Sequence, residues 1–187
     1  MKKFLLLQLF LFCAAALFAQ DFFRQNFDTG KKYILLADPT TSNIETVNFL
    51  VNNGLLDINL RKFNFVGIYA ENQNYDFEES LRYIEQNKLS HFKLHAFRGN
   101  LDKNRLFERN NYSEELRGVF QNSVGIFFFG GPDIPADVYG EENTFSEVTD
   151  PERHYFEATF LFHLLGGRQN ENFKPFLEEN PEYFVTG

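Results

Sequence analysis

The run Val124-Gly125-Ile126-Phe127-Phe128-Phe129 is the most apolar stretch after residue 20, and Gly130-Gly131-Pro132-Asp133 stops it abruptly. A short, continuous apolar run bounded by turn residues is typical of a strand buried on both faces of a sheet. We therefore expect residues 124–129 to form an interior strand of a parallel sheet. In such sheets ligands bind beyond the carboxyl ends of the strands, so the turn after Phe129 is a candidate site.

Strand and helix patterns alternate on both sides of this run. Apolar strand patterns occupy residues 33–37, 63–70, 92–97 and the start of 183–187. Helical spacing of apolar residues occupies residues 42–53, 77–89, 113–121 and 151–165, with Ser113 as the expected cap of the third helix. The alternation predicts an α/β fold: an open, mostly parallel sheet with helices on both faces. Residues 92–97 alternate polar with apolar side chains, which suits an edge strand or a half-covered position in the sheet.

Residues 1–20 have the features of a secretory signal peptide. Lys2 and Lys3 precede an apolar run, and Leu17-Phe18-Ala19 is typical of the end of a cleaved signal. A membrane anchor is the weaker interpretation, because the run is shorter than the ~20 residues of a spanning helix. We expect an exported protein, periplasmic or secreted, in which residues 21–187 belong to a single α/β domain. After cleavage this domain has no stable insertion in a membrane.

Charge and cysteine content exclude several classes of function. Without Lys2 and Lys3, 16 basic residues stand against 26 acidic ones, a formal charge of −10, so nucleic acid is not an expected partner. The only cysteine is Cys13, inside the predicted signal. Residues 21–187 therefore form no disulfide and hold no cysteine nucleophile. The histidines lack metal-ligand spacing, and no phosphate-binding loop occurs, so neither a metal nor a cofactor is expected.

The segment from Gly130 to Glu157 carries a more specific pattern than its two glycines. It reads Gly130-Gly131-Pro132-Asp133-Ile134-Pro135-Ala136-Asp137-Val138-Tyr139-Gly140-Glu141, followed by Asp150-Pro151-Glu152-Arg153 and Glu157. This pattern resembles the class I glutamine amidotransferase-like superfamily, and within it the gamma-glutamyl hydrolases, including the gamma-glutamyl-gamma-aminobutyrate hydrolase group. Two positions depart from the family: Pro135 lies one place early, and His154 replaces the usual acid after the arginine.

The resemblance implies a flavodoxin-like sheet and a role for each matching residue. It implies that the backbone of Gly130 and Gly131 supplies part of an oxyanion hole, with Gly131 favoured. It implies that Arg153 and Glu157 organise the loop and the helix and do not act in catalysis. The residues that it places in a substrate loop are Pro132, Asp133, Tyr139 and Glu141. The implied partner is a small gamma-glutamyl compound.

The family's nucleophile is a cysteine directly after a strand, in a Gly-(Ile/Val)-Cys-x-Gly context, with a later histidine and acid. Residues 183–187 begin such a strand, but the cysteine and the rest of the triad are absent. Thiolate attack on a gamma-glutamyl amide needs both the thiol and a base. We therefore expect the amino-terminal part of a gamma-glutamyl hydrolase-like enzyme, incomplete at its C-terminus and inactive alone. The alternative is a complete, non-catalytic secreted module that binds a small molecule or a protein partner.

Overall fold

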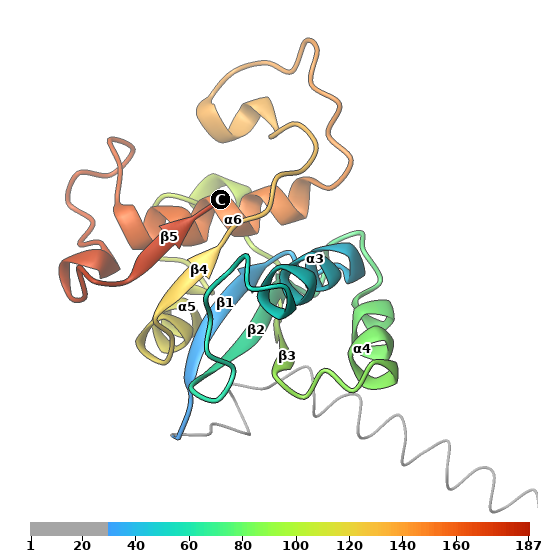
Figure 1. Cartoon of the computed structure of the whole chain (residues 1–187). Coiled ribbons are helices and arrows are strands. Elements are labelled where there is room, and N and C mark those ends of the chain that lie inside the picture. Colours follow the sequence, from blue (N-terminus) through green and yellow to red (C-terminus); the bar gives the residue numbers. More distant parts are fainter. Residues whose placement is uncertain (1–29) are drawn as a thin grey trace, which may run out of the picture.

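The computed structural model describes residues 30–187, so the predicted signal peptide lies outside the described residues. Among these residues, five parallel strands form one sheet in the order β3-β2-β1-β4-β5 (Figure 1). The strands are β1 (Lys32–Ala37), β2 (Phe63–Ala70), β3 (Phe92–Phe97), β4 (Gly125–Phe127) and β5 (Phe184–Thr186). The predicted parallel α/β sheet is confirmed, with β4 between two partners and β3 at an edge.

Within residues 30–187, four α-helices cover the two faces of the sheet. They are α3 (Thr41–Asn52), α4 (Phe77–Gln86), α5 (Ser113–Gln121) and α6 (Pro151–Leu165). Side chains of β1 alternate between two apolar clusters: Ile34 and Leu36 pack with α3 and α4, whereas Tyr33 and Leu35 pack with α5 and α6. Both faces are thus covered, which explains why the β1 sequence is a continuous apolar run.

Short 3-10 helices occur in three of the connections. They are η1 (Lys103–Arg105), η2 (Ala136–Tyr139) and η3 (Phe176–Glu178). The second lies in the long segment between β4 and α6, which extends beyond the carboxyl ends of the strands (Figure 1). Within the described range, every helix is too short or too polar to span a bilayer.

The ends of α6 follow from local sequence, whereas the start of α5 does not. The Asp150 side chain caps α6 by accepting a hydrogen bond from the Arg153 amide, and Pro151 occupies the first turn, where no amide proton is needed. The predicted capping role of Ser113 is wrong, because the N-cap of α5 is Tyr112 and makes no side-chain capping bond. Instead, the Ser113 hydroxyl lies 2.8 Å from Nε2 of His163 on α6.

Candidate functional site

The candidate site lies at the carboxyl edge of the sheet, where the loops after β1 and β4 meet the N-terminus of α6. Arg153, in the first turn of α6, connects these three elements. Its Nη1 lies 3.0 Å from Oδ2 of Asp38, the residue directly after β1. Its Nη2 donates a hydrogen bond of 2.8 Å to the carbonyl of Phe129, in the loop after β4. Its Nε donates to Oε1 of Glu157, one turn further along α6, at 2.9 Å.

The loop after β4 presents two amide protons on the side opposite Arg153. The carbonyl oxygens of Phe129 and Gly130 face the Arg153 guanidinium, at 2.8 Å and 3.4 Å. The peptide bonds of the described residues are trans, so the N–H of each unit points away from its carbonyl. The amides of Gly130 and Gly131 therefore point away from Arg153. Both residues are exposed, and neither amide donates to an atom of residues 30–187.

Glycine is required at position 131 by the close approach of Arg153. A Cβ atom built on Gly131 would lie 2.3 Å from the Arg153 Nη1 atom, far inside contact distance. At Gly130 a Cβ would meet no atom within 4 Å. The two glycines therefore differ. Gly131 allows the Arg153 guanidinium to reach the loop backbone, whereas the space around position 130 would admit a larger side chain.

Arg153 forms ion pairs with two acids, Asp38 and Glu157, and has one positive charge to offer them. Burial raises the pKa of Glu157 to about 7, and the attraction of Arg153 only partly opposes this rise. Burial also raises the pKa of Asp38, against the same opposing charge, with a further increase from the nearby Asp150. Desolvation disfavours the charged form of a carboxyl group, and one arginine does not compensate for two such groups. The site therefore takes up a proton near neutral pH, most readily at Glu157.

Side-chain hydrogen bonds hold the segment between β4 and α6 in place. The backbone N–H of Asn74, in the loop after β2, donates to Asp150 Oδ2 at 2.8 Å. The side-chain Nδ2 of Asn74 donates to the Thr149 carbonyl at 2.8 Å. The Tyr155 hydroxyl donates to Asp137 Oδ2 at 2.9 Å. These contacts connect the segment, at Asp137, Thr149 and Asp150, to the loop after β2 and to α6.

The structure separates the residues of the predicted substrate loop. Pro132 is exposed, and Asp133 accepts a hydrogen bond from the Glu147 amide at 3.1 Å, which braces the loop. Tyr139 lines an apolar cavity of about 410 Å³ beside α6, whereas Glu141 lines a different cavity of about 320 Å³. The loop residues therefore do not converge on one cavity. In contrast, Arg153 and Glu157, expected to organise the loop and helix, form the ion pair described above.

Asp38 is the site residue that sequence reasoning missed. The sequence shows it only as the stop after a strand, followed by Pro39. The structure buries it to 5% exposure and gives it the left-handed backbone angle φ of 50°. Aspartate tolerates this conformation better than most residues, and strained backbone is frequent at functional sites. The sequence position of Asp38 could have indicated its role, because an acid at the carboxyl end of a buried parallel strand lies where such sheets bind ligands.

The described residues offer no metal centre: residues 30–187 contain no group of three or more His, Cys, Asp and Glu side chains suited to hold an ion. Comparison of the chain with protein-family models, with curated proteins and with solved structures finds no match.

Proposed function

We propose that residues 130–157 form the oxyanion- and substrate-binding part of an exported, gamma-glutamyl hydrolase-like protein. The observation that carries the proposal is the orientation of the Gly130 and Gly131 amides. Their protons point to the same side of the loop, away from the arginine that holds their carbonyls. Two fixed backbone donors without an internal acceptor are what an oxyanion hole needs to stabilise the negative oxygen of a tetrahedral intermediate.

The surrounding geometry supports a fixed donor pair. Arg153 is 8% exposed, and its ion pairs with Asp38 and Glu157 fix the guanidinium that binds the Phe129 carbonyl. Preorganised donors stabilise a transition state because they need no rearrangement when charge develops. The same ring of contacts is consistent with the organising role that the family pattern implies for Arg153 and Glu157.

The nucleophile is not supplied by these residues. Hydrolysis in the resembled family proceeds through a cysteine, and residues 21–187 contain none. The proposed task of residues 30–187 is therefore to bind the gamma-glutamyl group and to polarise its amide oxygen. A gamma-glutamyl amide is accordingly expected to bind to this chain without being cleaved.

A matched pair of substitutions at position 130 tests the donor role. Gly130→Pro removes the amide proton, whereas Gly130→Ala keeps it and adds a Cβ into open space. Calorimetric titration with gamma-glutamyl-p-nitroanilide is expected to show similar affinities for the original chain and Gly130→Ala. Gly130→Pro is expected to bind about tenfold more weakly, the effect of one lost hydrogen bond to a buried or charged group.

Three results would contradict the proposal. They are the absence of binding by the original chain, equal affinities for Gly130→Pro and Gly130→Ala, and release of p-nitroaniline by the purified chain. The last result would mean that these residues contain a nucleophile of their own. Circular dichroism spectra of both variants establish that a loss of binding is not a loss of fold.

A further inference from the structure

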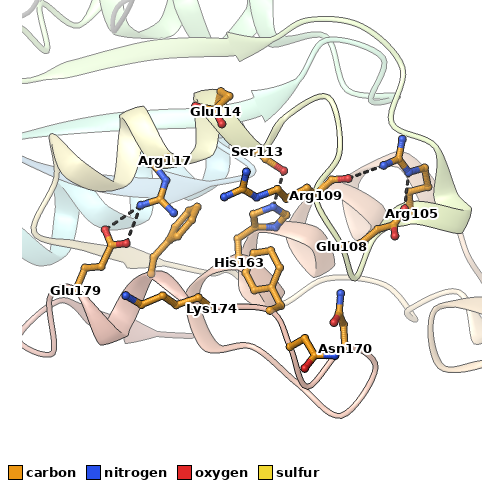
Figure 2. Close-up of a pocket in the computed structure, with 13 residues that line it drawn as sticks. Arg105, Glu108, Arg109, Ser113, Glu114, Arg117, His163, Asn170, Lys174 and Glu179 are labelled. Atoms are coloured by element: carbon orange, nitrogen blue, oxygen red, sulfur yellow. Dashed lines mark hydrogen bonds and ion pairs between the residues drawn. The ribbon is translucent and has the colours of Figure 1, made fainter.

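A separate cavity, of about 650 Å³, shares no lining residue with the candidate site and lies between the N-terminal end of α5, the C-terminal half of α6 and the segment that includes η3 (Figure 2). Four of the chain's 18 lysines and arginines line it, although the chain as a whole is acidic. These four are Arg105, Arg109, Arg117 and Lys174. Positive side chains are therefore concentrated around one cavity of an acidic protein.

Two of the four cations are neutralised within the protein, and two are not. Arg105 pairs with Glu108, and Arg117 donates through Nη1 to both carboxylate oxygens of Glu179, at 2.9 Å and 2.8 Å. Arg109 and Lys174 pair with no acid among residues 30–187. The cavity therefore has two positive charges that its own acids do not balance at close range.

The orientation of Arg117 is fixed, and donors remain on it. Its guanidinium carbon lies 4.6 Å from the centre of the Phe176 ring, and its ion pair with Glu179 uses Nη1. Nη2 and Nε of Arg117 have no acceptor among the described residues. In the view of Figure 2 the guanidinium groups of Arg109 and Arg117 both lie on the side of the His163 ring that faces α5. Both cations line the same cavity, which favours an anion within it.

The floor of the cavity is a neutral, hydrogen-bonded histidine. His163 is fully buried, its Nδ1 donates to the Thr159 carbonyl at 2.7 Å, and Nε2 accepts from the Ser113 hydroxyl at 2.8 Å. Burial and the positive charges of Arg117 and Arg109 all lower the pKa of His163. His163 therefore adds no charge of its own, and the ring of Phe173 packs against it.

We propose that this cavity binds a small phosphate monoester. Four cations line the cavity against three acids, Glu108, Glu114 and Glu179, so the lining has a positive excess that favours an anionic group. Arg109 and Arg117 offer the planar donors that suit phosphate oxygens. Glu114 is the opposing charge: it lines the cavity at the upper rim, away from the His163 ring (Figure 2). The volume exceeds that of a phosphate ion, and Phe173 and Phe176 provide apolar surface for the organic part of the ligand.

Calorimetric titration with inorganic phosphate and with phenyl phosphate, at pH 8 where both are largely dianions, tests the proposal. Phenyl phosphate is expected to bind, and to bind more tightly than phosphate. The double variant Arg109→Gln/Lys174→Gln is expected to bind phenyl phosphate at least tenfold more weakly, as for lost charge-assisted hydrogen bonds. Glu114→Gln is expected to bind it more tightly, because a repelling charge is removed.

The matched control is Arg61→Gln/Lys62→Gln, which removes two exposed cations elsewhere on the surface and changes the net charge equally. Its affinity for phenyl phosphate is expected to stay within twofold of the original chain. Absence of phenyl phosphate binding, an equal loss in the control, or no loss in Arg109→Gln/Lys174→Gln would overturn the proposal. These outcomes do not depend on the gamma-glutamyl site, because Arg109 and Lys174 have no role there.

Discussion

Replacing Glu157 by glutamine is expected to stabilise the protein at pH 8, although it removes an ion pair. Glu157 Oε1 lies 2.9 Å from Arg153 Nε, yet the pKa of its carboxyl is raised to about 7. The raised pKa means that the penalty of burying the charge exceeds the attraction of Arg153, which Asp38 shares. Glutamine keeps an oxygen that accepts the Arg153 hydrogen bond and removes the buried charge.

The magnitude follows from the shift in pKa. The pKa of this carboxyl moves from 4.5 to about 7 on folding, and each pKa unit corresponds to about 1.4 kcal/mol, so the ionised form is disfavoured by about 3 kcal/mol in the folded state. Since the folded state binds this proton more tightly, the contribution of Glu157 to stability is most favourable below pH 4.5 and declines as the pH rises to about 7. Glu157→Gln removes this decline.

Urea unfolding followed by far-UV circular dichroism measures the effect. At pH 8 the Glu157→Gln chain is expected to unfold with a free energy about 3 kcal/mol above that of the original chain. At pH 5 the difference is expected to fall below about 1 kcal/mol, because the original carboxyl is then protonated in the folded state. The control Glu85→Gln, at an exposed position on α4, is expected to change stability by less than about 0.5 kcal/mol at both pH values.

A Glu157→Gln chain that is less stable than the original at pH 8 would refute the reasoning, because the ion pair would then outweigh the burial of the charge. So would an equal difference in stability at pH 5 and pH 8, since the gain would then have no connection with ionisation of this carboxyl.

Three further predictions concern glycines, and thermal unfolding measures each of them. Gly131→Ala would place a Cβ 2.3 Å from Arg153 Nη1, so it is expected to destabilise the protein by about 1–3 kcal/mol. Gly130→Ala places its Cβ in open space and is expected to leave the stability nearly unchanged. Equal effects of the two substitutions would exclude the close approach of Arg153 to Gly131. Gly125→Ala would place a Cβ 2.2 Å from the ring of Phe184 on β5. It is expected to destabilise the protein by at least as much as Gly131→Ala. Gly118→Ala, in α5, is expected to stabilise by about 0.5–1 kcal/mol, and a loss of stability there would contradict the helical placement.

The bounds of several elements were predictable because local sequence determines them. The helix predicted over residues 151–165 matches α6, since a capping aspartate with a proline starts it and a glycine ends it. The strands predicted over 63–70 and 92–97 match β2 and β3. In each case the deciding signal lies within or next to the element.

The end of β4 was not predictable from local sequence. The apolar run predicts a strand through Phe129, but β4 ends at Phe127. The carbonyl of Phe129 bonds to Arg153 on α6 and does not continue the sheet. An apolar residue in a strand and one in the turn that follows have the same local pattern, so only the contact with the distant arginine distinguishes them.

The candidate site was predictable only in part, for the same reason. The glycines, Arg153 and Glu157 are visible as a sequence pattern, whereas the role of Asp38 depends on a contact between residues far apart in the chain. The separation of Tyr139 from Glu141 depends on the path of the loop, which the hydrogen bonds from Asn74 help to fix. A motif specifies residue types, and the tertiary contacts decide which of them meet.

The most direct test of the central claim is to follow the backbone amide resonances of Gly130 and Gly131 by NMR during titration with gamma-glutamyl-p-nitroanilide. The account predicts that both amide protons move downfield together and saturate at one ligand per chain, because both donate to the ligand's carbonyl oxygen, while no p-nitroaniline is released. If these two resonances stay in place while the ligand perturbs other residues, or if no resonance moves, the two amides are not an oxyanion-binding pair.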